Sequence, residues 1–226
     1  MEQEWFSATS FDCVTFWPHI RKQHRKVRLF SLACSRRAIN LLADKEFESI
    51  LEIAELFADQ HIDWQLVEEV RKDLGKIHKR IHSECRAVED FGQYSTGSLV
   101  DATLKKPSQA IRSYRKARFA FAFFCQPDPE QHRLRYSAEE LVQVALARDI
   151  FGNPFQPVTF DPAWRTPESI NIAGRMYDSR DFSAMPILAD ALEEGGCTNS
   201  NVLLHCRESG AHVRGCWVVD LVLGKS

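Results

Sequence analysis

The sequence predicts an all-α protein: an irregular multi-helix bundle with an extended strap of prolines and aromatic residues and a compact C-terminal helical module. Apolar residues recur at three- and four-residue steps in most long stretches, which is the spacing of one helix face. Helices do not alternate with strands, and no internal repeat has a solenoid period. We expect the strap at residues 151–164, because Pro154, Pro157 and Pro162 fix φ and remove hydrogen-bond donors there.

Composition and charge indicate an ordinary globular protein. The 226 residues are enough for one large domain or two small ones. Apolar residues make up 44% and charged residues 27%, and the net charge of −2 creates no strong field toward nucleic acid or membrane. No apolar run is long enough to cross a bilayer, and the acidic start lacks the pattern of a secretory signal. Seven scattered cysteines suit a reducing compartment, so we expect a cytoplasmic protein without a membrane partner.

Punctuation along the chain suggests three regions. Residues 90–98 contain two glycines together with serine and threonine, which is typical of a linker. We therefore expect an N-terminal helical region at 1–92, a middle helical region at 99–150, and a C-terminal strap and helical module at 151–226. The three regions are expected to pack as one globular unit.

The N-terminal region has two clear helical patterns. The Trp17-Pro18 step should break or bend the segment before them. Residues 24–42 read as an amphipathic helix, and Asp63 suits the N-cap of another. His78 and His82 lie four apart on the second helix and could share a metal, although histidines on a charged helix are more often simply exposed. The apolar residues of that helix step by three and four, as in antiparallel helix packing: Val67, Val70, Leu74, Ile77 and Ile81.

The middle region predicts two helices separated by prolines. Residues 117–125 are rich in alanine and phenylalanine, so we expect a buried helix that stops at residues 126–129. Ser137 and Glu140 have the spacing of a capping box, which predicts the start of the next helix. The apolar face of that helix would be Leu141, Val144, Ala145 and Ile150.

The C-terminal region predicts four short helices after the strap. Thr166-Pro167-Glu168 provides an N-cap, a proline at the first helical position and a first-turn acid. Ser183 would cap the second helix, a third is expected at 201–206, and residues 213–223 are interpreted as a buried helix ended by Gly224. The inward residues of the second helix would be Ile187, Leu188, Ala191 and Leu192.

One group of residues in this region has the composition of a zinc site: Cys197, Cys206, His212 and Cys216, spaced C-x8-C-x5-H-x3-C. Zinc in structural sites takes four cysteine or histidine ligands in a tetrahedron. His205 is a competing ligand beside Cys206. The group has no C-x2-C knuckle, however, and free cysteines are often small buried apolar residues. Two interpretations therefore stand, a structural zinc site and a set of core thiols.

Catalytic chemistry finds little support. His212, Cys216 and Asp220 would share one face of a helix and combine a base, a nucleophile and an acid. Side chains stacked along one helix rarely reach the geometry of a triad, and no oxyanion donor is identifiable. The chain has no phosphate loop, H-E-x-x-H or G-x-S-x-G motif. We assign no catalytic residues, and whether the protein is an enzyme stays open, with non-enzymatic function preferred.

Two basic runs without acidic residues lie at 21–37 and 105–118. They are interpreted either as solvated helix faces or as a phosphate-binding surface. Their cations are Arg21, Lys22, Arg25, Lys26, Arg28, Arg36, Arg37, Lys105, Lys106, Arg112, Arg115, Lys116 and Arg118.

Several stretches resemble a family of planctomycete-type bacterial paralogues. They are Phe-Gly-Asn-Pro-Phe at 151–155, Met-Pro-Ile-Leu-Ala-Asp-Ala-Leu-Glu-Glu at 185–194, His-Cys-Arg at 205–207 and Arg-Gly-Cys-Trp-Val-Val-Asp-Leu-Val-Leu-Gly-Lys at 214–225. The Glu-Trp pair at 4–5 and the run from Arg28 to Arg37 also fit. The family is uncharacterised and brings no catalytic residues. The resemblance implies a shared C-terminal module attached to a more variable helical body.

These observations favour a non-enzymatic helical protein that binds another macromolecule, with a protein partner preferred. The alternative is a nucleic-acid-associated protein that uses the two basic runs. A structural zinc site near the C-terminus is compatible with either function. Salt distinguishes them, because binding to phosphates weakens steeply as salt rises and a hydrophobic interface does not. The partner and the oligomeric state do not follow from the sequence.

Overall fold

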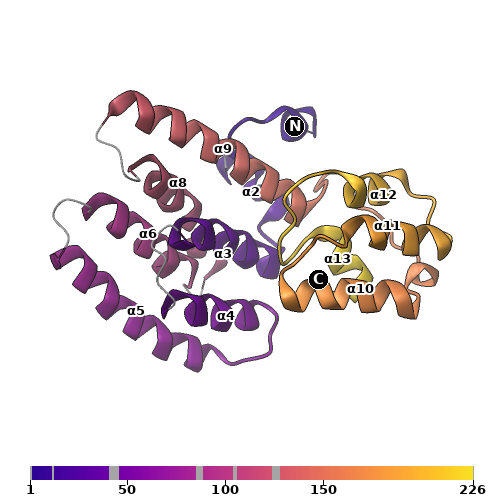
Figure 1. The fold of residues 1–226 in the computed structure, drawn as a ribbon, viewed down its shortest axis with the longest axis horizontal. Helices are drawn as coiled ribbons and strands as arrows, with labels where there is room; N and C mark the ends of the chain where they lie inside the picture. Colours follow the sequence, from indigo (N-terminus) through magenta and orange to yellow (C-terminus); the bar gives the residue numbers. More distant parts are fainter. Residues whose placement is uncertain are drawn as a thin grey trace. The chain divides into compact units, whose positions relative to one another are not determined.

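The computed structural model describes residues 2–11, 13–40, 46–84, 89–103, 106–123 and 128–225. All regular structure in these residues is helical, with no strand, which confirms the all-α prediction (Figure 1). The chain forms two compact units. We call Gln3–Val144 the N-terminal unit, and Met1–Glu2 with Ala145–Ser226 the C-terminal unit. No helix in the described part of the chain is both long and apolar enough to cross a membrane.

The helices follow one another with short connections. Those that begin before the strap are α1 (Glu2–Ser7), α2 (Cys13–Ile20), α3 (His24–Asn40), α4 (Glu46–Ala58), α5 (Trp64–Glu84), α6 (Glu89–Ala102), α7 (Pro107–Ala110), α8 (Ser113–Phe123) and α9 (Pro129–Phe151). Those that follow the strap are the 3₁₀ helix η1 (Pro162–Trp164), α10 (Pro167–Ser179), α11 (Met185–Glu194), α12 (Ser200–Arg207) and α13 (Trp217–Leu223).

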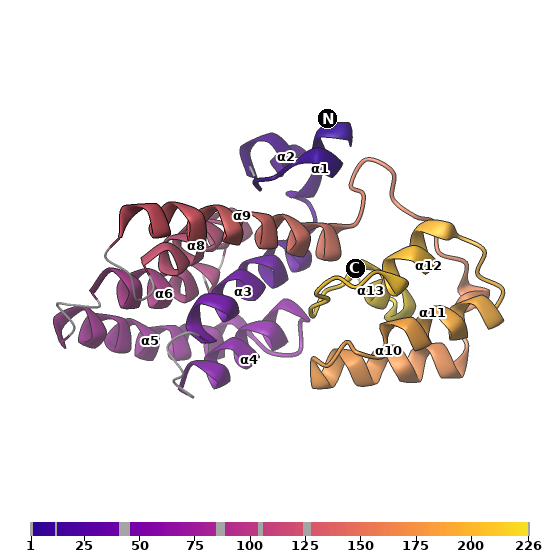
Figure 2. The same cartoon turned by 45° about the horizontal axis from the view of Figure 1, so that its top comes forward.

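Helix α3 is the centre of the N-terminal unit and contacts α4, α6 and α8 (Figure 2). Its predicted apolar face is buried, as Val27, Phe30, Cys34 and Ala38 are all solvent-excluded. Helix α5 begins directly after Asp63 and buries Val67 and Leu74, with Val70 and Ile77 packed against the same core. The side chains of His78 and His82, and that of Ile81, lie outside the described residues.

One predicted interruption in the N-terminal unit is wrong. Residues 90–98 are not a linker but part of α6, which packs against α3, α5 and α8. The small residues that suggested a linker, Thr96 and Ser98, are fully buried, so their size allows close helix packing that outweighs low helix propensity. Pro18 lies inside α2, so of the two predicted effects of the Trp17-Pro18 step, a break and a bend, the break does not occur.

Helix α9 begins earlier than predicted. Asp128 accepts a hydrogen bond from the backbone N–H of Glu130 (3.0 Å), and Pro129 is the first helical residue, which is a favourable helix start. Ser137 therefore lies inside the helix, and the predicted capping box does not form. Val144 and Ile150 are buried as expected, whereas Leu141 is 55% exposed.

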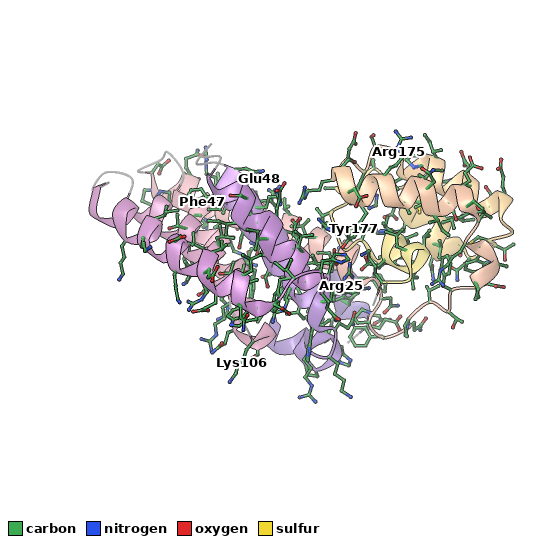
Figure 3. All side chains as sticks on the ribbon, turned by 90° about the horizontal axis from the view of Figure 1, so that it is seen from below. Arg25, Phe47, Glu48, Lys106, Arg175 and Tyr177 are labelled. Carbon is green, nitrogen blue, oxygen red and sulfur yellow. The ribbon has the colours of Figure 1, made fainter. Side chains whose placement is uncertain are left out.

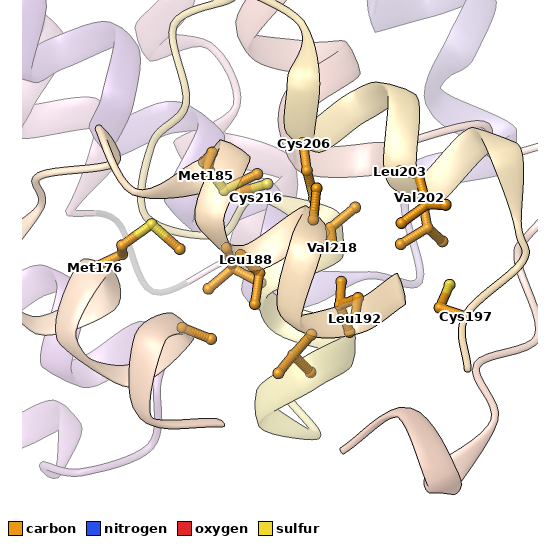
Figure 4. Packing of buried hydrophobic residues seen from close by; sticks show 14 of the residues in the cluster. Met176, Met185, Leu188, Leu192, Cys197, Val202, Leu203, Cys206, Cys216 and Val218 are labelled. Atoms are coloured by element: carbon orange, nitrogen blue, oxygen red, sulfur yellow. The ribbon is translucent and has the colours of Figure 1, made fainter. Parts of the chain in front are cut away.

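The C-terminal unit matches the predicted order of a strap followed by short helices. The non-helical part of the strap covers residues 152–161, which is shorter than the predicted 151–164, because Phe151 ends α9 and Pro162–Trp164 form η1. Phe160 and Trp164 pack against the core of the unit. Thr166 caps α10 by accepting from the N–H of Ser169 (3.1 Å). Figure 4 shows residues of this core, in which methionine, leucine, valine and cysteine side chains from α10 to α13 meet.

Three details of that unit differ from the prediction. The N-cap of α11 is Ala184, which makes no side-chain cap, so Ser183 does not have the predicted role. Ile187 is 58% exposed, while Leu188 and Leu192 are fully buried. The last helix, α13, covers only Trp217–Leu223, because residues 213–216 form a turn.

Candidate metal centre

Four side chains of the C-terminal unit converge on one point. Asp149 lies in the last turn of α9 and His205 in the last turn of α12. His212 is in the loop between α12 and α13, and Cys216 is the N-cap of α13. Within the described part of the chain, they are the one group of three or more histidine, cysteine and acidic residues that could hold a metal ion.

The local sequence explains how two of these donors are placed. The N–H of Cys216 donates to the carbonyl of Val213 (2.9 Å), which closes a four-residue turn. Gly215, the third residue of the turn, has φ of 97°, and a turn with this conformation strongly favours glycine. The turn brings His212 and Cys216 to the same place, although they do not lie on a common helix.

The donor atoms are close enough to share one ion. Nδ1 of His212 is 2.7 Å from Oδ1 of Asp149, and Nε2 of His205 is 3.2 Å from the same oxygen. Nε2 of His205 is also 3.2 Å from Sγ of Cys216, and Nδ1 of His212 is 3.9 Å from that sulfur. All four donor atoms lie within 4.8 Å of one another. The two imidazoles and the thiol therefore surround a single carboxylate oxygen.

The site is largely buried and its groups influence one another's protonation. Burial alone would raise the pKa of Asp149, but hydrogen bonds from His205 and His212 and their charge lower it below its ordinary value. Burial, together with the nearby Asp149 carboxylate, raises the pKa of the Cys216 thiol well above its ordinary value, and the amides of Val219 and Val218 only partly oppose this. Asp149 therefore stays ionised, while Cys216 keeps its proton unless a cation replaces it.

Asp149 and His212 each have a second polar atom that does not face the centre of the site. Oδ2 of Asp149 accepts a hydrogen bond from the N–H of Val213 (2.9 Å), which fixes the carboxylate to the loop that carries His212. Nε2 of His212 is buried and has no hydrogen-bond partner among the residues that the structure describes. The polar contacts that orient the His212 ring are therefore those of its other nitrogen, Nδ1, at the centre of the site.

The structure brings together two of the four residues predicted from spacing. His212 and Cys216 are in the converging group, and its other members are His205, noted as a competing ligand, and Asp149. Cys197 and Cys206 are fully buried in the apolar core. Figure 4 shows Cys197 well to one side of Cys216.

Sequence reasoning missed Asp149 because it lies far from the other donors along the chain. A signal was available, however. Asp149 is an acid between Leu146, Ala147 and Ile150, which are all buried, and a buried carboxylate requires partners. The pattern predicts a paired acid at this position, but not which residues pair with it.

The arrangement differs from a nucleophilic triad. In a triad, the base contacts the nucleophile with one ring nitrogen and the acid with the other. Here Nε2 of His205 is near both the thiol and the carboxylate. Asp220, the acid suggested by the sequence, is buried within α13 rather than part of the converging group.

Many cations of the first basic run are engaged inside the N-terminal unit. The guanidinium of Arg28 lies 4.7 Å from the ring centroid of Phe57, and burial lowers its pKa to about 10. Arg21 and Lys22 are exposed. Three arginines form ion pairs with acids of the same unit: Arg25 with Asp59, Arg36 with Glu48 and Glu55, and Arg37 with Glu139.

The second basic run also contains both paired and exposed cations. Lys116 pairs with Asp101 (2.9 Å), and buried Arg118 pairs with Glu140. The exposed cations of this run are Lys106, Arg112 and Arg115, whereas Lys105 lies outside the described residues. Figure 3 labels one residue of each kind, buried Arg25 and exposed Lys106.

Comparisons with known proteins found no matching family model, no matching curated protein and no matching solved structure. The resemblance to planctomycete-type paralogues stays a prediction, and the function has to be argued from the site itself.

Proposed function

We propose that the C-terminal unit binds one Zn²⁺ ion through Asp149, His205, His212 and Cys216, and that the ion has a structural role. The observation that carries this proposal is the convergence of one carboxylate oxygen, two imidazole nitrogens and one sulfur on a common point. Oxygen, nitrogen and sulfur donors in this number match the tetrahedral preference of zinc.

The spacing of the donor atoms supports zinc in particular. Tetrahedral bonds of the usual lengths put neighbouring donors about 3.3–3.6 Å apart. Three of the contacts are 3.2, 3.2 and 3.9 Å, and the hydrogen bond of 2.7 Å between His212 and Asp149 would open slightly around an ion. The other donor pairs lie within 4.8 Å of one another, so an ion would draw some of the donors closer together and separate others.

A structural role follows from the number of donors. Four protein ligands fill the coordination sphere of tetrahedral zinc and leave no position for a reacting water. The ligands come from α9, α12, the loop after α12 and the start of α13, so an ion would connect all of these elements. We propose that the ion stabilises the C-terminal unit by holding these elements together.

Metal analysis tests the proposal directly. Plasma emission spectrometry on the full chain, purified without a metal-chelate column, should give close to one zinc per chain. Asp149→Asn, His205→Ala and Cys216→Ser should each lose zinc. Cys197→Ser and Cys206→Ser are matched controls that should retain it, because these thiols are outside the converging group. Zinc-free wild-type protein, or zinc lost only in the two controls, would contradict the proposed site.

For the chain as a whole, a protein-binding function stays a proposal, and one observation favours it. The C-terminal unit has a groove between α10 and α11 of mixed character. Its apolar lining residues are Ile172, Met176, Ala184 and exposed Ile187, and its polar ones are Glu168, Arg175, Ser179, Asp181 and Ser183. A surface groove that combines apolar side chains with two carboxylates is more suited to a protein segment than to phosphates. Chemical cross-linking of captured partners should then be lost in Ile187→Lys and retained at high salt.

The nucleic-acid alternative has less support because many of its cations are already paired. Its test should use only exposed residues. Reversal of Arg21, Lys22, Lys106 and Arg112 to glutamate should abolish a gel shift at low salt if the alternative holds. Reversal of Arg25 is unsuitable, since its partner Asp59 would be left with a like charge in a buried pair.

A further inference from the structure

His205 is the most exposed of the proposed nitrogen ligands, and an aromatic ring lies against it. Its side chain is 15% exposed, against 6% for His212. The imidazole of His205 packs near two rings, with its centroid 4.9 Å from that of His212 and 5.1 Å from that of Trp217. Among the described residues, the hydrogen-bonding and ionic contacts of the His205 ring all involve Nε2. The orientation of the ring therefore depends on packing, and Trp217 provides much of it.

Trp217 also lies against the end of α9. Gly152 follows the last residue of that helix and has φ of 62°. A Cβ atom on Gly152 would lie 3.1 Å from Cγ and 3.2 Å from Cδ2 of the Trp217 indole, which is closer than ordinary van der Waals contact. The backbone three residues after Asp149 thus lies directly against the indole. Trp217 connects the segment of one proposed ligand, Asp149, to the ring of another, His205.

We propose that Trp217 is a positioning residue of this metal site. Its indole holds the His205 ring so that Nε2 faces Asp149 and Cys216, and it covers the side of the site on which a ligand is most exposed. Groups around a metal's ligands control ligand orientation and solvent access in this way. The inference rests on the proposed zinc-binding function and adds a residue that does not itself touch the ion.

Cobalt provides the test, because Co²⁺ in a tetrahedral site with a thiolate gives visible and near-ultraviolet absorption bands. The metal-free full chain would be titrated with Co²⁺, and the rate of band loss after EDTA addition would be recorded. Trp217→Leu should raise the Kd for Co²⁺ by about tenfold or more and accelerate the loss. Trp217→Phe should stay close to wild type, since a phenyl ring can still pack on His205.

Two further variants separate positioning from general stability. Trp164→Ala removes an indole that packs on the same core through Phe160, so it should lower the melting temperature without changing the Kd. The added methyl group of Gly152→Ala would displace the Trp217 indole and should therefore also weaken Co²⁺ binding. Circular dichroism would restrict the comparison to temperatures at which each variant is folded.

The outcomes are distinguishable. A wild-type chain that gives no cobalt bands would refute the zinc-binding function and the role of Trp217 with it. Normal bands in the wild type, with unchanged Kd and release rate in both Trp217→Leu and Gly152→Ala, would overturn the role of Trp217 alone. Equal weakening by Trp164→Ala would also overturn it, because the effect would then be one of core stability.

Discussion

Burial governs the chemistry of the thiols in the C-terminal unit. It raises the pKa of Cys206 to about 12 and that of Cys216 well above its ordinary value, and it also raises the pKa of Cys197. A thiol that keeps its proton at neutral pH is a poor nucleophile. At Cys216 the adjacent imidazoles and carboxylate allow a metal ion to replace that proton, whereas Cys206 and Cys197 lie in an apolar core.

This difference predicts how the native protein reacts with an alkylating reagent. At neutral pH, iodoacetamide should leave Cys206 and Cys216 unmodified in the folded chain, because both are fully buried, and modify both after unfolding in guanidinium. Peptide mass spectrometry would identify the labelled positions. Fast labelling of Cys216 in the folded protein would contradict a buried metal ligand and revive a catalytic role for this residue.

Glu139 shows the opposite balance of charge and burial from Asp149. It is only 2% exposed and accepts two hydrogen bonds from Arg37, at 3.2 and 2.8 Å. Burial nevertheless raises its pKa above the ordinary value of 4.5, with Arg37 opposing the shift. Between the ordinary and the raised pKa, the folded chain therefore binds more protons than the unfolded chain.

The sign of the resulting pH dependence follows. The contribution of Glu139 to the free energy of unfolding is fully present below its unfolded pKa and decreases as pH rises through its folded pKa. In Glu139→Gln this titration is removed. Urea denaturation over acidic pH should show the advantage of wild type over Glu139→Gln decreasing as pH rises from about 4.5 and then levelling. An advantage that grows with pH would contradict a raised pKa.

The candidate site was predictable only as far as local spacing extends. His212 and Cys216 follow from a histidine and a cysteine separated by a short glycine-containing loop. Asp149 could not be placed beside them, because its position depends on where α9 ends relative to α12, which is decided by packing. Cys206 was misleading for a physical reason, since a buried cysteine and a ligand cysteine have the same residue type and similar neighbours.

At the scale of helices, their existence was predictable and their ends were less so. Periodic apolar residues correctly indicated α3 and α5, because burying one face dominates the energy of such segments. Ser137 failed as a cap because Asp128 and Pro129 offer an earlier start and helical propagation is favourable once begun. The segment at 90–98 failed because small residues can mark either a linker or a tight helix interface, and only the packed neighbours decide.

Two neighbouring residues of α11 test which face of this helix is buried in the core. Leu188 is fully buried in the C-terminal core, whereas the adjacent Ile187 is 58% exposed. Leu188→Ala should therefore lower the free energy of unfolding by about 2–5 kcal/mol. Ile187→Ala is the matched control and should change it by no more than about 0.5 kcal/mol. Chemical denaturation monitored by circular dichroism checks both, and similar costs at the two positions would mean that α11 presents a different face to the core.

At the scale of the molecule, the proposed ion would act within one of the two units. Its first and last ligands, Asp149 and Cys216, are 67 positions apart (216 − 149), so coordination would close a long loop. Cross-links that close long loops remove the most conformational entropy from the unfolded chain. All four ligands belong to the C-terminal unit, and none belongs to residues 3–144.

Metal removal should therefore destabilise the two units unequally. Free zinc at one hundred times its Kd stabilises the state that binds it by about 2.7 kcal/mol, and a chelator should abolish this contribution. Hydrogen exchange followed by mass spectrometry, with and without EDTA, should show faster exchange in α12, α13 and the end of α9, and unchanged exchange in α3 and α5. Cys216→Ser should exchange at the chelated rate with or without EDTA. Equal acceleration in both units would show that the ion supports more than the C-terminal unit, and no acceleration anywhere would mean that the four donors hold the fold through their own hydrogen bonds.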